Sequence, residues 1–219
     1  MPIAFDAVGT ARFNPASAGT YSHVTSGNNR ELVVGIGVAT GDDVIGTVTY
    51  NAVSLTLGTQ VQLPGTIRRV YIWRLTNPTT GTNNVIISSS ASVDIMAVSA
   101  SYTGVAQSGQ PDAGSTATST IGSIIGTVTT IAVNAWAIAC TTNDQDNIAA
   151  GAGQTMRGSV SVTGIGDSNS DITPAGAYTM QTNRQGAGNA NWGMALISLA
   201  PVALVAEQNA RRSLLGVGL

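Results

Sequence analysis

The sequence predicts an all-β fold, an antiparallel β-sandwich that is followed by a C-terminal extension. Apolar residues recur along the chain with a period of two, as in strands, and not with the period of 3.6 that marks helices. Clusters of Gly, Asn, Asp, Ser and Pro separate these apolar runs, and no helix-period segment of useful length precedes residue 200. Short strands with regular turns between them are typical of sandwiches and barrels.

Five segments alternate most clearly, and we expect each of them to form a strand. Gly35 and Gly37 share one face of the first segment, where they allow another backbone or a bulky ring to approach closely. The Ser-, Thr-, Ala- and Gly-rich stretch 113–130 is expected to be a loop that enters a strand at Ile124. The five expected strands cover residues 32–39, 70–75, 93–102, 133–140 and 192–199.

The same alternation predicts the core. Tyr71 and Trp73 lie in mid-strand on one face, where core rings are expected, and Cys140 is expected to act as a small buried hydrophobe. The further side chains whose period-two placement predicts burial are Leu32, Val34, Trp136, Ile138 and Trp192.

The strand that carries Tyr71 and Trp73 is apolar on both faces, because Val70 and Ile72 occupy the other one. A strand of an antiparallel sandwich commonly keeps one face toward solvent. We therefore predict that Val70 and Ile72 are interface residues covered by another subunit, and that the protein is a homo-oligomer.

Charged residues make up only 9% of the chain, with 9 basic and 11 acidic side chains and a formal net charge of −2. This balance argues against a protein that coats nucleic acid, which needs a basic excess. No apolar run approaches the ~20 residues of a membrane helix, and the opening residues do not have the pattern of a signal peptide. The expected partners therefore include neither nucleic acid nor a membrane.

Catalytic side chains are scarce. His23 is the only histidine, Glu31 and Glu207 are the only glutamates, and no Gly-x-Ser-x-Gly elbow is present. Without a two-histidine metal site or a recognisable carboxylate pair, the sequence predicts neither an enzyme nor a bound cofactor. His23 is expected to be structural.

The loop 144–147 alternates oxygen-bearing side chains as a calcium loop does, but its spacing departs from that of an EF-hand. Asp42 with Asp43, and Asp167 with Asp171, are similar acidic positions in loops. We expect solvated turn residues at all of them, with a structural Ca²⁺ as the alternative.

Pro201 ends the last expected strand, so we divide the chain into a sandwich of residues 1–200 and an arm of residues 201–219. The arm is apolar and ends without the polar residues usual at a free terminus. We expect its leucines to enter an apolar groove of a neighbouring chain and its arginines to pair with acidic groups there. The predicted arm interface residues are Leu204, Val205, Arg211, Arg212, Leu214, Leu215, Val217 and Leu219.

Several stretches of strand and turn form a characteristic succession: NRELVVG at 29–35, VTYNAVSLT at 48–56, VYIWRLTNP at 70–78 with TGTNNV at 80–85, SYTGV at 101–105, and the Trp192 strand. This succession resembles a group of jelly-roll proteins found in phage virions and in prophage-containing bacterial genomes. The resemblance covers residues 1 to about 200. The related pattern has Asn-Gly at the tight turn where this chain has Asn51-Ala52, and Ala resists the positive φ of a type I′ hairpin.

The resemblance implies a β-sandwich of jelly-roll type and a non-enzymatic virion structural protein. Within that group we expect a capsid decoration or cement protein, on the capsid surface rather than the tail, with the major capsid protein as partner and a trimer as its oligomeric state. The alternative is a glycan- or receptor-binding module of a tail fibre or surface protein. That alternative requires Trp73, Tyr102 or Trp192 to be exposed.

Overall fold

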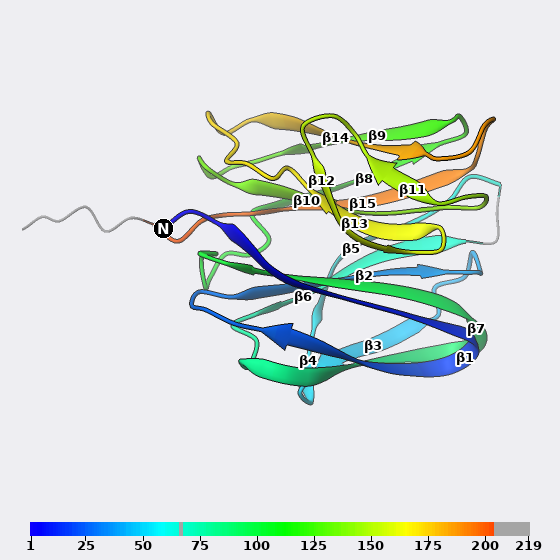
Figure 1. Ribbon diagram of the computed structural model, residues 1–219, viewed down its shortest axis with the longest axis horizontal. Helices are drawn as coiled ribbons and strands as arrows, with labels where there is room; N and C mark the ends of the chain where they lie inside the picture. Colours follow the sequence, from blue (N-terminus) through cyan, green and yellow to red (C-terminus); the bar gives the residue numbers. More distant parts are fainter. Residues whose placement is uncertain (66–67, 204–219) are drawn as a thin grey trace, which may run out of the picture.

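The computed structural model describes residues 1–65 and 68–203, and within these residues the chain is all-β with antiparallel strand pairing (Figure 1). The predicted antiparallel sandwich is confirmed, whereas the jelly-roll topology stays a prediction. The strands are β1 (Ala4–Thr25), β2 (Glu31–Val38), β3 (Ile45–Tyr50), β4 (Val53–Ser54), β5 (Thr56–Gln62), β6 (Arg69–Thr76), β7 (Gly81–Thr103), β8 (Ala113–Ser119), β9 (Ser123–Thr129), β10 (Trp136–Asn143), β11 (Ile148–Ala150), β12 (Thr155–Val160), β13 (Thr163–Asp167), β14 (Ala177–Arg184) and β15 (Trp192–Leu199).

The described strands form three sheets. A seven-stranded sheet has the order β4-β3-β7-β2-β6-β5, with β1 paired to β7 outside this path. A five-stranded sheet has the order β12-β13-β10-β15-β8, and a three-stranded sheet has the order β11-β14-β9. Figure 1 shows the three-stranded sheet at the top, the five-stranded sheet below it, and the seven-stranded sheet as the lower half of the molecule.

The long strands β1 and β7 form a bent ribbon that takes part in two layers. The second half of β7 pairs with β2, whereas its first half pairs with β3. β1 follows β7 along its other side, with register shifts between Phe13 and Ala18. The Phe13 ring packs over Gly19 so closely that a Cβ there would lie 2.3 Å from the ring. The ribbon folds over near these register shifts, so that one sheet forms two facing layers (Figure 1).

Three hydrophobic cores fill the spaces between the resulting four layers. The first lies inside the folded seven-stranded sheet and includes Val34, Val48 and Ile87. The second, around Ile138, lies between the seven-stranded and the five-stranded sheet. The third, around Trp192, lies between the five-stranded and the three-stranded sheet. The inner strands β2, β10 and β15 are therefore buried along their whole length.

This layering corrects the interpretation of Val70 and Ile72. Both side chains are fully buried within the single chain, in the core shared with Ile197 of β15, while Tyr71 and Trp73 point into the core on the other side of β6. The apolar second face of this strand is covered by the chain's own five-stranded sheet. Val70 and Ile72 are thus core residues and not a surface for another subunit.

The other predictions for the core are confirmed, since Leu32, Val34, Trp136, Ile138, Trp192 and Cys140 are all buried. The stretch 113–130 is a further correction. Its first part forms β8 of the five-stranded sheet in place of the expected loop, whereas the strand expected from Ile124 is present as β9 of the three-stranded sheet. The Asn51-Ala52 turn adopts φ values of 49° and 62°, so Ala52 takes the left-handed conformation of a type I′ turn.

Candidate functional site

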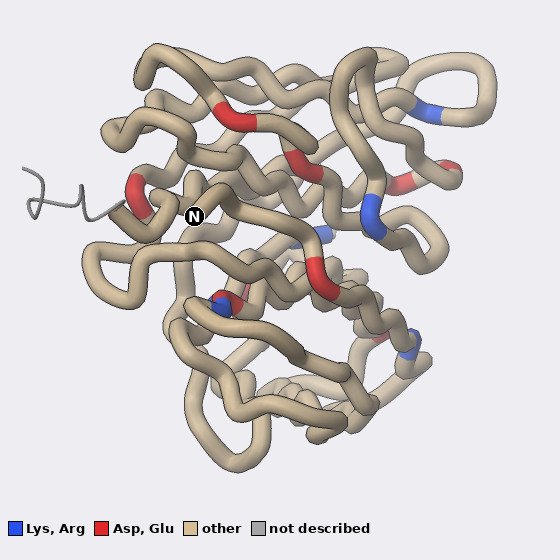
Figure 2. Tube along the Cα trace, turned by 60° about the vertical axis from the view of Figure 1, so that its left-hand side comes forward, with Lys and Arg blue, Asp and Glu red and all other residues tan. Residues whose placement is uncertain are grey.

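The charged residues of the described part of the chain are scattered singly or in pairs along the Cα trace (Figure 2). Most of them bind partners within the protein. Arg74 pairs with the fully buried Glu31 at 2.8 Å, and Arg12 pairs with Asp94 at 2.8 Å. Burial raises the pKa of Glu31, whereas the hydrogen bond that Arg74 donates to it acts to lower this pKa. These pairs bind strands to one another and leave few charges for a partner or substrate.

Asp167 is the centre of a buried polar cluster between the two inner layers. Arg157 Nε donates to its carboxylate at 2.6 Å and Tyr102 Oη donates to it at 3.0 Å. The Arg157 guanidinium also lies 4.5 Å from the centroid of the Phe5 ring, a cation–π contact. Burial and the neighbouring carboxylate raise the pKa of Tyr102 well above its usual value, which keeps the phenol a neutral donor. The cluster connects β7, β12 and β13, and Asn169 extends it, since its N–H donates to Asp167 at 3.0 Å.

His23 is buried at 2% exposure, and its surroundings differ from those of a catalytic histidine. Its Nδ1 shares a 2.8 Å hydrogen bond with Ser99 Oγ, while Nε2 has no partner. Burial lowers the pKa of His23 to about 4, although the charge of Asp6 acts in the opposite direction. The Asp6 carboxylate accepts hydrogen bonds from Ser26 and Ser101 instead of the imidazole. A neutral, enclosed imidazole of this kind supports the structural role predicted for it.

The acidic loop 144–147 directs its carboxylates at protein donors. Asp146 accepts a 2.6 Å hydrogen bond from Arg184 Nε, and both oxygens of Asp144 accept hydrogen bonds from Asn191. Within residues 1–65 and 68–203, no group of three or more His, Cys, Asp or Glu side chains is placed to hold a metal ion. Asp43 likewise accepts from Gln60 at 2.9 Å. The carboxylates of these acidic loops thus bind donors of the protein itself, mostly other side chains.

The aromatic side chains that a glycan-binding surface requires lie inside the protein. Tyr102 and Trp192 are fully buried, and Trp73 is 8% exposed. A sugar ring stacks only on an accessible aromatic face, so none of these three residues provides such a platform. The sequence-based alternative of a glycan-binding module thereby loses the side chains on which it depended.

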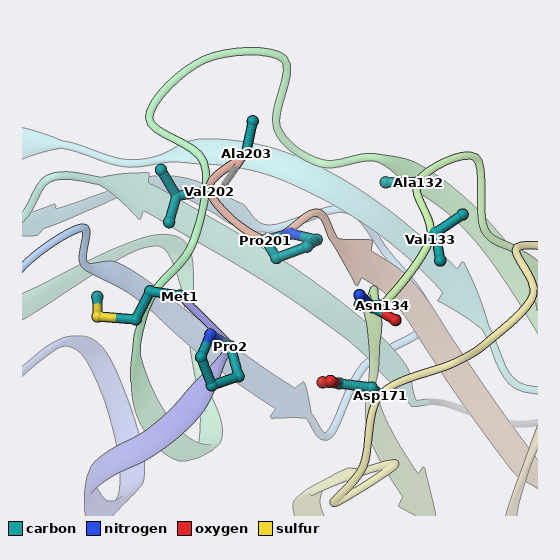
Figure 3. A pocket seen from close by; sticks show the side chains of 9 residues that line it. All are labelled: Met1, Pro2, Ala132, Val133, Asn134, Asp171, Pro201, Val202 and Ala203. Atoms are coloured by element: carbon teal, nitrogen blue, oxygen red, sulfur yellow. The ribbon is translucent and has the colours of Figure 1, made fainter. Parts of the chain in front are cut away.

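A hollow of about 450 Å³ opens at the end of the molecule where the arm begins (Figure 3). In Figure 3, Asn134 and Asp171 lie close together on one side of this space, and Pro2 lies on the other. Asp171 is the charged side chain among the lining residues. The complete lining consists of Met1, Pro2, Ala132, Val133, Asn134, Asp171, Pro201, Val202 and Ala203. We call this the terminal hollow.

The loop beside the terminal hollow holds large apolar side chains in solvent. Ile131 is 76% exposed and Val133 is 53% exposed. The backbone N–H groups of Ile131 and Ala132 donate to the Asp112 carboxylate at 2.8 and 3.0 Å, and that of Asn134 donates to the Ile172 carbonyl at 2.9 Å. Because the backbone is fixed at three points, these apolar side chains cannot withdraw by a simple rearrangement of the loop.

Hydrogen bonds also fix other residues that line the hollow. Trp136 Nε1 donates to the Asp171 carboxylate at 3.0 Å, which places this acidic group at the rim. The chain leaving β15 pairs with the end of β7, since Val202 N–H donates to the Gly104 carbonyl at 2.8 Å. The arm thus begins from a fixed point on the wall of the hollow.

The structure describes the predicted strand residues of the interface but not the predicted arm residues. The strand residues Val70 and Ile72 belong to the core, as described above. The arm residues Leu204, Val205, Arg211, Arg212, Leu214, Leu215, Val217 and Leu219 lie outside the described residues. Sequence reasoning missed the hollow because it placed Val133 at the start of a strand, whereas β10 begins at Trp136. The sequence signal that could have indicated the hollow was the apolar pair Ile131 and Val133, which precedes β10.

Comparisons with protein-family models, curated proteins and solved structures found no significant match. In the part of the chain that the structure describes, no helix is long and apolar enough to cross a membrane. The residues themselves therefore carry the argument about function.

Proposed function

We propose that this protein is a non-enzymatic virion structural protein that acts through contacts between protein subunits. The observation that carries the proposal is the terminal hollow, with its fixed, exposed apolar side chains beside the start of an apolar arm. Exposed apolar groups that a folded protein holds rigidly are typical of interaction sites. The internal use of most charged side chains supports the same conclusion, because it leaves contact area as the main means of recognition.

Within this class, the function that we propose is that of a decoration or cement protein on a phage capsid. This part of the proposal rests on the resemblance of the strand succession to jelly-roll virion proteins. The major capsid protein is then the expected partner, the capsid surface is the expected location, and a trimer is the expected assembly.

The test uses particles of a phage or prophage whose genome encodes this chain. We expect the protein in purified particles at a copy number that is a fixed multiple of the capsid subunit, and on the capsid in electron micrographs. Particles made without it should open at a lower temperature, and adding the purified protein back should restore their stability. Absence of the chain from purified particles would falsify the virion assignment, and a location confined to the tail would overturn the decoration role.

A further inference from the structure

We infer that the terminal hollow of one copy receives residues 204–219 of the arm of a second copy of this chain. The inference deepens the proposed function and rests on it, since it names a second copy as one partner of the interface. Its evidence is the shape, the charge and the position of the hollow relative to the start of the arm.

The hollow and the arm have matching chemistry. The hollow combines apolar walls, among them Pro2 and Val133, with the exposed carboxylate of Asp171. The arm combines leucines with the adjacent arginines Arg211 and Arg212. An arginine fork binds a carboxylate well, and a carboxylate at the rim of an apolar space fixes the register of the segment that enters it.

The position of the arm favours a second copy over the same chain. Ala203 is itself part of the wall, so the arm starts at the rim of the hollow. Arg211 is the eighth residue after Ala203, and an extended chain of that length reaches roughly 28 Å. Asp171 lines the same hollow as Ala203, so an arm of that reach passes beyond the Asp171 of its own chain unless it folds back. A neighbouring arm enters the hollow without this reversal.

The exposed side chains around the hollow point to the same occupant. Ile131 lies beside it, and Val133 and Met1 on its wall are 53% and 45% exposed. When two copies exchange arms, each copy both donates a segment and receives one, and their neighbouring ends meet. This arrangement covers the apolar rim as well as the hollow, and it closes the assembly at two copies in place of the trimer that the resemblance implies.

The test is a charge swap in the full-length chain, measured by sedimentation velocity at micromolar concentration. One variant carries Asp171→Arg, and the other carries Arg211→Glu together with Arg212→Glu. Each variant alone opposes like charges across the interface, so we expect its self-association to be at least about tenfold weaker than that of the unmodified chain. In an equimolar mixture, each arm meets a hollow of opposite charge, and association should return.

Recovery on mixing separates an exchanged arm from one bound within its own chain, because mixing changes nothing in the second case. Asp171→Asn keeps an acceptor for Trp136 and removes only the charge, so its association should fall by a smaller factor. Asp42→Arg reverses an exposed aspartate elsewhere and should have no effect. A monomeric unmodified chain, or variants that associate as well as it does, overturns the exchange. If the unmodified chain is monomeric but still binds particles, the exchange is overturned and the proposed function is not.

Discussion

At the scale of single residues, His23 makes the stability of this fold depend on pH. The folded protein holds the imidazole neutral, with a pKa lowered to about 4 by burial, while an unfolded chain titrates near 6.5. As the pH falls from 6.5 to 4, the unfolded chain binds a proton that the folded chain does not bind. Stability contributed by His23 is therefore complete above pH 6.5, is lost across this window and stays lost below it.

We expect the free energy of unfolding to lose about 3 kcal/mol from His23 between pH 6.5 and pH 4. His23→Asn keeps a polar atom toward Ser99 but does not titrate, so the difference between the two proteins should depend on pH only in this window. Urea unfolding at a series of pH values measures it. The comparison also removes the effect of Glu31, whose raised pKa acts in the opposite sense. A pH-independent difference would show that the imidazole is not the titrating group.

Ala52 is a second residue whose conformation has a measurable cost. Its φ of 62° lies in the left-handed region, where a residue with a Cβ is less stable than glycine by roughly 1–2 kcal/mol. Ala52→Gly should therefore stabilise the protein by about 1 kcal/mol, after allowing for the greater freedom of glycine in the unfolded chain. Asn51→Gly is the matched control. Asparagine tolerates this conformation well, so the urea midpoint should move further for Ala52→Gly than for Asn51→Gly.

At the scale of elements, the inner strands depend on places where no side chain fits. A Cβ at Gly35 on β2 would lie 2.4 Å from Cys140 Sγ and 2.9 Å from Ile165 on the facing sheet. Gly35→Ala should destabilise the protein by about 1–3 kcal/mol, because the two sheets must separate or their side chains must move. Gly46→Ala on β3 is the control, since nothing lies within 4 Å of its added Cβ. Equal chemical-denaturation midpoints for the two variants would show that the inner sheets tolerate this extra volume.

The alternation of apolar residues predicted the inner strands better than the outer ones. β2, β6, β10 and β15 carry large apolar residues, and each overlaps a predicted segment. β8 and most of β1 were missed because Ala, Gly, Ser and Thr dominate them, and such residues are as common in loops. Their strand conformation comes from pairing with β15 and β7, which no local pattern reveals.

The error at Val70 and Ile72 has a related cause. Period two shows that a face is buried but does not say what buries it. The apolar second face of β6 was a correct sign of a further layer, and that layer is the sheet formed by β10 and β15 of the same chain. The terminal hollow is harder still to predict, because it joins residues 1–2, 132–134, 171 and 201–203 from separate parts of the sequence.

At the scale of the whole molecule, the three cores are closed by residues that precede the arm. A chain that ends after Ala203 should therefore keep its melting temperature within about 3 °C of the full chain. A chain that ends after Ala200 should melt lower, because it loses Pro201 and the Val202 hydrogen bond to Gly104. Calorimetry of the two truncations compares them directly. If the chain that ends after Ala203 already unfolds, the arm is an internal part of the fold.

The place of β15 in its sheet also has a mechanical consequence. This strand lies between β10 and β8 and is hydrogen-bonded to both along its length, and the arm continues from its end. Hydrogen bonds between antiparallel strands run across the strand direction. A force that pulls on the arm along β15 therefore shears the two ladders at the same moment, instead of opening them one bond at a time. If a neighbouring copy holds the arm, as proposed, a force on that interface acts along the direction in which the two ladders resist together.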